Sequence, residues 1–150
     1  MWSVMAYDNN LFFTCSLIEF MGRQRKLRRA DVVSGLGDEA INRIYNYADV
    51  FHCEPIAKVA DETIARSGMG IGDFDNVATC RYAVPSYWDI GKVYARLIED
   101  VLPEDATEPI GTLNEVYGSW ISDSISNYNS DFFYQPRDYI RECYREGKVL

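Results

Sequence analysis

Carboxylates are the side chains of this sequence whose placement most suggests a chemical role, because they gather in one segment. Between Arg96 and Arg137 the chain has no Lys or Arg for forty residues. The acids of this segment are Glu99, Asp100, Glu104, Asp105, Glu108, Glu115, Asp123 and Asp131. The rest of the chain is balanced at fifteen acids and fifteen bases, so these residues account for the whole net charge of -8. A field of one sign raises the local concentration of oppositely charged partners and speeds their encounter.

Aromatic side chains, among them Trp120 and Phe133, lie between these carboxylates. Aromatic anchors beside charges of one sign are typical of protein contact surfaces. We therefore predict that the eight acids, with Trp120 and Phe133, bind a basic partner protein. The alternative is that the acids only keep the protein soluble.

His52 and the four cysteines are the residues that suggest nucleophilic or metal chemistry. Cys15, Cys53, Cys80 and Cys143 are widely spaced, and His52 is the single histidine. No pair has the close spacing of a strong zinc motif, so we predict no metal site, no cofactor and reduced, structural thiols. We predict no catalytic residue. A small enzyme centred on His52 and a cysteine stays open as an alternative, if the fold brings the two together.

Five cations lie in residues 23–29, just before the helices expected on either side of Gly37. A basic run beside two short helices invites comparison with helix-turn-helix proteins, and a DNA-binding regulator that uses this linker is a second alternative. The helix that would enter the major groove begins with Asp38 and Glu39, however, and DNA phosphates would repel it. A solvated loop is the more usual use of such a run.

Apolar residues recur at helical spacing in all long segments. The spacing predicts helices over residues 10–21, ended by Gly22, over 30–36, ended by Gly37, over 38–52, and from Pro55 to Gly68. A packed loop is expected over 68–84. Capping-box spacing at Ser86 and Asp89, and again at Thr112 and Glu115, predicts the starts of two later helices, and Pro136 opens a last helix that Gly147 ends.

The predicted fold is all-α, a bundle of six or seven helices with a C-terminal acidic helical hairpin. Residues 1–102 would form a helical body and residues 103–150 the acidic, aromatic-rich hairpin, as separate parts or within one single domain. The apolar run near the N-terminus is interrupted by polar residues, and no basic residue precedes Arg23. We therefore expect neither a signal peptide nor a membrane span, and a cytoplasmic protein.

Short motifs within residues 11–65 resemble a group of bacterial proteins. The motifs are Cys15-x-x-Ile18-Glu19, Asp31-Val32-Val33, Ile44-Tyr45 leading to Phe51-His52, and Ile56-x-x-Val59-Ala60-Asp61-x-x-Ile64. Together they resemble small uncharacterised proteins of mobile elements, often encoded beside ADP-ribosyltransferase-like toxin genes. The resemblance implies an accessory or antitoxin-like role. It does not extend to Gly68 and beyond, and it assigns no functional residue.

These observations favour a non-catalytic protein that neutralises a basic partner by charge mimicry. The acidic segment would occupy a surface that otherwise holds nucleic acid or a phosphorylated substrate. An antitoxin, or a phage-encoded inhibitor of a nucleic-acid-processing defence enzyme such as an anti-CRISPR protein, would have these properties. No direct nucleic-acid or membrane partner is predicted, and the sequence does not indicate an oligomeric state.

Overall fold

The computed structural model describes residues 4–150, with side chains from Asn9 onward, and these residues are all-α. The helices are α1 (Val4–Arg25), α2 (Arg29–Asn46), α3 (Ala48–Phe51), α4 (Ile56–Ser67), α5 (Tyr87–Val101), α6 (Ile110–Tyr117), α7 (Trp120–Ser126), a 3-10 turn η1 (Phe132–Tyr134) and α8 (Arg137–Glu146). No strand occurs in this range, which confirms the predicted fold class. None of the helices described here combines the length and the apolar character that a membrane crossing requires.

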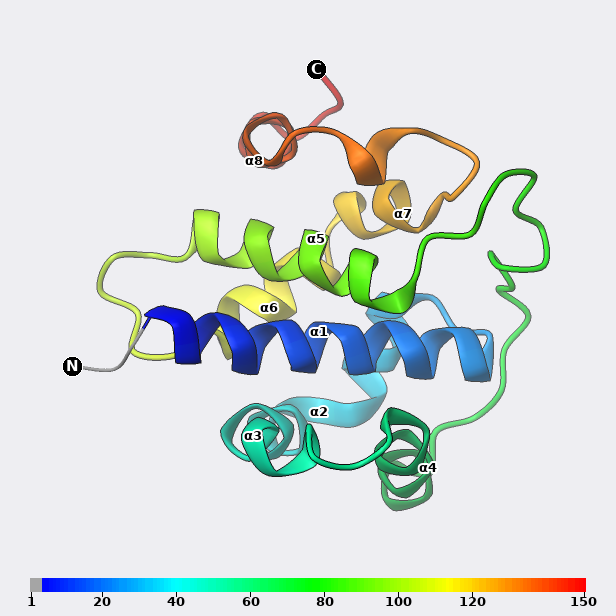
Figure 1. Cartoon of the computed structure of the whole chain (residues 1–150). Helices are drawn as coiled ribbons and strands as arrows, with labels where there is room; N and C mark the ends of the chain where they lie inside the picture. The colour runs from blue at the N-terminus through cyan, green and yellow to red at the C-terminus, as the bar shows by residue number, and fades with distance from the viewer. Residues whose placement is uncertain (1–3) are drawn as a thin grey trace.

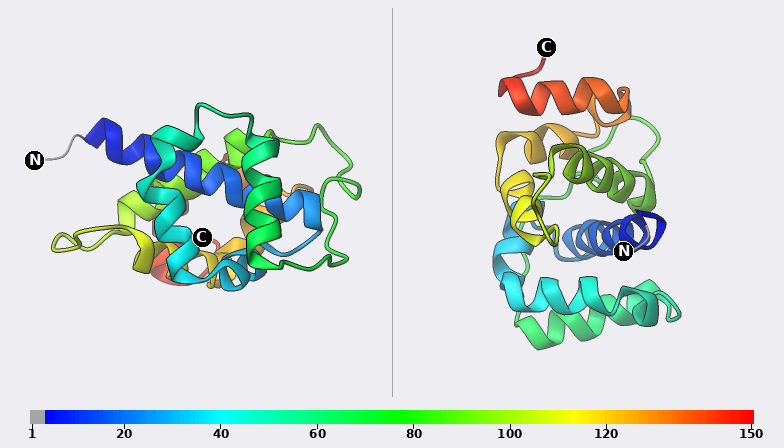
Figure 2. Two further views of the ribbon diagram at one scale, coloured as in Figure 1. Left: turned by 90° about the horizontal axis from the view of Figure 1, so that it is seen from below. Right: turned by 90° about the vertical axis from the view of Figure 1, so that its left-hand side faces the viewer.

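The central element is α1, which packs against α5 on one side and against α2, α3 and α4 on the other (Figure 1). The layers are seen end-on in Figure 2, where α8 covers the outer side of α5. Buried apolar residues from before and after Pro103 belong to one core, with Leu17 and Ile98 on one side and Leu113 and Ile140 on the other. The C-terminal part therefore shares the core of the body.

Helix α1 is longer than predicted, because Gly22 lies inside it. Lys26 has the left-handed φ of 55° that ends the helix, and the N–H of Leu27 donates to the Gly22 carbonyl over 3.0 Å. This is the bonding pattern of a Schellman cap, with a lysine where glycine is usual. The expected stop at Gly22 was wrong, because this glycine serves another element, described below.

Helices α1 and α5 touch at Gly91, which is buried. A Cβ atom added to Gly91 would lie 2.7 Å from the Cα of Ser16. The absence of a side chain therefore lets the two backbones approach closely.

Local signals placed several helix ends correctly. Ser86 and Asp89 form the predicted capping box of α5. Gly68 and Gly147 end α4 and α8 in the left-handed conformation. Gly37, with φ 78° and ψ 166°, kinks α2 at the predicted break.

The predictions of one helix over 38–52 and of a capping box at Thr112 and Glu115 were wrong. The helix expected over 38–52 ends at Asn46, and α3 follows as a separate turn. The second capping box does not form: α6 begins at Ile110, Thr112 lies buried within it, and the carboxylate of Glu108 accepts the Ile110 N–H over 2.6 Å. The expected acidic hairpin consists of α6, α7, η1 and α8, because Gly118 and Ser119 separate α6 from α7.

The long connection from Gly68 to Ser86 has no helix or strand, as expected for a packed loop. Its backbone is tied to the end of α1, where the Gly72 N–H donates to the Arg25 carbonyl over 2.9 Å and the Phe74 N–H to the Lys26 carbonyl over 2.8 Å. These bonds satisfy carbonyls that a helix end leaves without partners. A Cβ on Gly72 would lie 2.6 Å from the Lys26 carbonyl oxygen, so this approach requires glycine.

Candidate functional site

A charged network lies buried between α1, α2, the long connection from Gly68 to Ser86 and the segment between α7 and η1. It contains two arginines of the predicted basic linker. The side chains of Glu19 and Arg29 are 0% exposed. Arg29 donates from Nε to Glu19 Oε1 over 2.9 Å and from Nη2 to Glu19 Oε2 over 3.0 Å. Arg23 donates to the same carboxylate over 3.0 Å and to the Pro85 carbonyl over 2.7 Å.

Polar groups from distant segments complete this network. The Tyr128 hydroxyl donates to Glu19 Oε2, and Arg29 Nη2 donates to Asn76 Oδ1 over 3.1 Å. Asn76 in turn donates to the Ser126 carbonyl over 2.9 Å. Each charged group thus has several partners, which is the condition under which a buried ion pair is tolerated.

The electrostatics keep this pair ionised. Burial alone would raise the pKa of Glu19, but the charges and hydrogen bonds of Arg29 and Arg23 outweigh it and lower that pKa. Burial and the Glu19 charge raise the pKa of Tyr128 to about 12, so its hydroxyl keeps the proton that it donates. No group here is poised to exchange a proton near neutral pH, and the network serves to hold segments together.

Gly22 makes room for this network. A Cβ atom at Gly22 would lie 2.7 Å from Arg29 Nε and 2.8 Å from Arg29 Nη1. The arginine therefore crosses α1 at the one position without a side chain. Sequence reasoning missed the pair, although Glu19 in an otherwise apolar helix face was a visible signal.

The other cations of residues 23–29 also have acceptors within the protein. Arg25 donates to the Met69 carbonyl over 2.8 Å, Arg28 lies 2.9 Å from Asp123, and Lys26 lies 3.9 Å from Asp75. The linker is thus used to join segments of the fold. This weighs against the alternative that it binds DNA phosphates.

The acids of residues 97–136 fall into two groups. The carboxylate of Asp100 accepts hydrogen bonds from Arg137 Nε and Nη2, each over 2.8 Å, and Glu99 lies 3.9 Å from the same arginine. Asp123 is held by Arg28 on another side of the molecule. These three acids have partners within the protein.

The remaining acids have no cation within ion-pair distance among the residues that the structure describes. Glu104, Asp105 and Glu108 lie exposed in the loop between α5 and α6, which reaches out from the helices in Figure 2. Glu115 is exposed on α6, and Asp131 is exposed just before η1. The fold thus spreads these acids over several elements, and three of them gather in the projecting loop.

The two predicted aromatic anchors pack within the protein. Trp120 is half-buried with its ring centroid 6.4 Å from that of Phe132. Phe133 is half-buried and 6.0 Å from the ring of Tyr128. The most exposed aromatic side chains in the same region are Tyr82 and Tyr134, at 66% and 68%.

The structure does not bring His52 to a cysteine pair or cluster. His52 and Cys53 are exposed after α3, Cys80 is half-buried in the long loop, and Cys15 and Cys143 are buried. Burial raises the pKa of Cys15 to about 12, so its thiol stays protonated. Among the described residues, no three His, Cys, Asp or Glu side chains group closely enough to share a metal ion.

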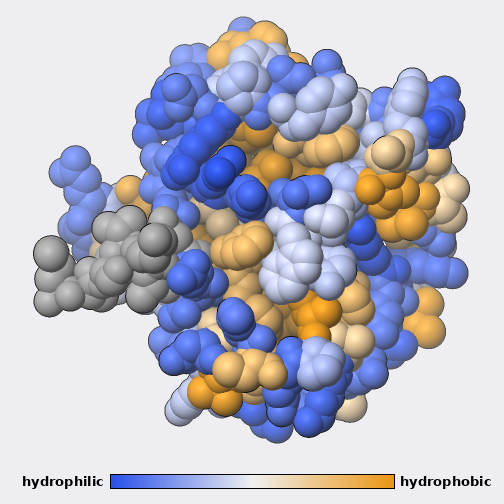
Figure 3. All heavy atoms as spheres, in the orientation of Figure 1, coloured by the Kyte–Doolittle hydropathy of each residue, from blue (hydrophilic) through white to orange (hydrophobic). Residues whose placement is uncertain are grey.

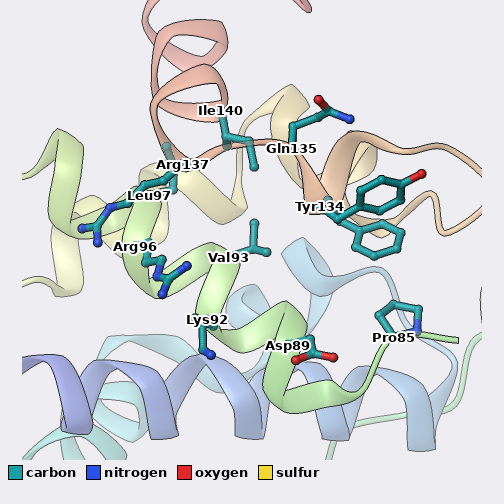
Figure 4. A pocket seen from close by; sticks show the side chains of 11 residues that line it. Pro85, Asp89, Lys92, Val93, Arg96, Leu97, Tyr134, Gln135, Arg137 and Ile140 are labelled. Carbon is teal, nitrogen blue, oxygen red and sulfur yellow. The ribbon is translucent and has the colours of Figure 1, made fainter.

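A groove that sequence reasoning missed lies between α5, η1 and the start of α8, with a volume of about 280 Å³. Figure 3 shows apolar residues at the bottom of a hollow between α8 and α5, with hydrophilic residues at its rim. In Figure 4, Val93 and Ile140 face one another across it, Arg96 lies at one side and Tyr134 at the other. Lys92 and Arg137 also line it. The fold therefore brings Arg96 and Arg137, the cations on either side of residues 97–136, to the same groove.

Comparisons with family models, with curated proteins and with solved structures found no match to this chain. The resemblance of residues 11–65 to mobile-element proteins therefore stays a prediction.

Proposed function

We propose that this chain is a non-catalytic binding protein whose exposed carboxylates engage a basic partner. The observation that carries the proposal is the group Glu104, Asp105 and Glu108, three exposed acids within five residues of a projecting loop. Neither ion pair nor nearby cation neutralises them in the described part of the chain. By contrast, Asp100 and Asp123, which have a structural use, are held by arginines.

An unneutralised group of this kind acts over a long range. Its field adds to that of Glu115 and Asp131 in a chain whose net charge is -8, and it would accelerate encounter with a cationic surface. A surface that binds nucleic acid is strongly cationic, because contacts of Lys and Arg with phosphates dominate its affinity. The partner class that fits is therefore a basic, nucleic-acid-binding protein, which the chain would inhibit by charge mimicry in the manner of an antitoxin or a phage-encoded inhibitor.

The structure changes which aromatic residues would contact such a partner. Trp120 and Phe133 are committed to internal packing, so their replacement would cost stability before it cost binding. Tyr134 and Tyr82 are exposed beside Asp131 along a second hollow. These two tyrosines are the better candidates for a contact that slows dissociation.

The test compares two triple charge reversals of equal size. Glu104→Lys, Asp105→Lys and Glu108→Lys change the loop, whereas Glu39→Lys, Glu62→Lys and Asp73→Lys change exposed acids elsewhere. A protein that the wild type and the control variant capture from lysate, and that the loop variant loses, is then purified. Its association rate should fall with salt for the wild type and much less for the loop variant, and duplex DNA should compete for it.

Equal binding by the loop variant and the wild type would reject the proposal, because the acids would then only solubilise the protein. Binding that both triple variants lose equally would show dependence on net charge without a defined surface. A partner that duplex DNA does not displace would reject charge mimicry.

A further inference from the structure

The groove between α5, η1 and α8 has the chemistry of a binding site for a small organic anion, and this inference is independent of the proposed function. Its floor is apolar, formed by Val93, Leu97 and Ile140 with the ring of Phe133. Its rim carries positive charge on one side, from Arg96 and Lys92. An apolar concavity with few polar groups at its edge is the usual form of a small-molecule site.

Arg96 has no ion-pair partner among the residues that the structure describes with side chains. Asp100, one helical turn further along α5, would be its natural partner in an isolated helix, but both carboxylate oxygens of Asp100 are taken by Arg137. Lys92, one turn earlier, also has no ion-pair partner among the described residues, and both side chains are exposed. The fold thus assigns the nearby acid to Arg137 and leaves two cations of like sign, one turn apart, beside an apolar floor.

The groove also has a polarity along its length. Arg96 and Arg137 lie at one end in Figure 4, and Asp89 lies at the other. Asp89 is fixed there, since it accepts the Ser86 N–H in the cap of α5. Its carboxylate would repel an anion, so the charged end of a ligand is directed to Arg96 and its apolar body lies between Val93 and Ile140.

We infer that this groove binds a small organic anion, a carboxylate or phosphate monoester attached to an aromatic or aliphatic body of about one ring. The size follows from the volume of about 280 Å³, just below the usual range for pockets that hold drug-sized ligands. The Tyr134 ring, exposed at the rim opposite Arg96, supplies an aromatic wall for the apolar body of the ligand. Arg96 gives a carboxylate or a phosphate two parallel hydrogen bonds.

The experiment uses three aromatic probes on the full chain, phenylacetate, phenyl phosphate and the neutral phenylacetamide, and inorganic phosphate as a fourth probe without an apolar body. Backbone amide resonances of α5 and α8 are followed by heteronuclear NMR during each titration. Both anions should shift the resonances of residues 92–97 and 137–140, and phenylacetamide should bind at least about tenfold more weakly. Equal binding of the amide would overturn the role of charge, and inorganic phosphate binding as well as phenyl phosphate would overturn the role of the apolar floor.

Two arginine variants localise the effect. Arg96→Gln should raise the Kd of phenyl phosphate about tenfold, because it removes a charge-assisted hydrogen bond. Arg81→Gln removes an exposed arginine of the long loop that does not line the groove, and should leave that Kd unchanged. Equal effects of the two variants, or none from Arg96→Gln, would reject the site.

A separate readout keeps this inference distinct from the proposed function. The variant reversed at Glu104, Asp105 and Glu108 keeps the groove, so it should bind phenyl phosphate like the wild type. Tyr134→Ala, at an exposed position that should not disturb folding, should weaken both aromatic anions and leave inorganic phosphate unaffected. Loss of phenyl phosphate binding in the loop variant would show that the probes report net charge.

Discussion

The two most charged stretches of this chain, residues 23–29 and residues 97–136, are used in opposite ways. The cations of the first are turned inward or joined to neighbouring segments, and Arg29 and Arg23 meet at the buried Glu19. The acids of the second are partly joined to arginines, and those on a projecting loop have no ion-pair partner among the described residues. A run of like charges therefore reveals its use only when the partners supplied by other segments are known.

The largest expected effect is on the buried region. Glu19→Gln leaves the Arg29 guanidinium buried without its counter-charge, so the free energy of unfolding should fall by about 3–5 kcal/mol in urea titrations followed by circular dichroism. The double variant Glu19→Leu with Arg29→Met removes both charges and should lose much less. A loss below about 1 kcal/mol for Glu19→Gln would show that the network is dispensable.

The second largest loss of stability is expected when the space that Gly22 leaves for Arg29 is filled. Gly22→Ala places a methyl group against Arg29, and we expect a loss of about 1–3 kcal/mol from overpacking. Gly111→Ala, in α6, is the matched change in the acidic segment, where a Cβ meets nothing within 4 Å. It should stabilise the protein by about 0.4–1 kcal/mol. Equal effects in urea unfolding would contradict the difference between the two regions.

The pH dependence sharpens the same contrast. Because Arg29 and Arg23 lower the pKa of Glu19 in the folded protein, its stabilisation is present above the ordinary carboxyl value of 4.5 and is lost as the pH falls through the lower, folded value. The difference in free energy of unfolding between wild type and Glu19→Gln should be constant at neutral pH and should shrink as the pH falls below the ordinary carboxyl pKa of 4.5. A difference that does not change between neutral pH and pH ~3 would contradict it.

Duplex DNA should be bound weakly, with a Kd above about 1 μM near physiological salt, because the linker arginines have acceptors within the fold. Fluorescence anisotropy with a labelled duplex measures this. Tighter, salt-dependent binding that is lost in Arg28→Gln would restore the DNA-binding alternative.

The smallest expected effect on stability is that of the loop reversal. Glu104→Lys with Asp105→Lys, the two reversals that leave the Glu108 cap of α6 in place, should change the free energy of unfolding by less than about 0.5 kcal/mol, because both side chains are exposed. Thermal unfolding checks this. A large loss would show that the loop acids are structural, and the proposed binding surface would lose its basis.

Local signals in the sequence were enough to predict the helices whose ends depend on nearby residues. Pro55 with Gly68, the box of Ser86 and Asp89, and Gly147 each act within one turn of the helix that they bound. The end of α1 was predicted wrongly because Gly22 makes room for the side chain of Arg29, and the two residues are in contact only in the folded protein. The groove was missed for the same reason. Forty residues separate Arg96 from Arg137 in the sequence, and only the packing of α8 on α5 brings the two close together.

The bonds of the long loop from Gly68 to Ser86 also make the order of this loop depend on the buried network. Its backbone bonds end on the last carbonyls of α1, Asn76 bonds to Arg29 and Ser126, and the Pro85 carbonyl accepts from Arg23. These acceptors and donors come together only after α1, α2 and the Tyr128 segment have assembled. The loop should therefore lose its protection from proteases and hydrogen exchange when Glu19 and Arg29 separate, and a Glu19 variant should be cleaved first between Gly70 and Val84.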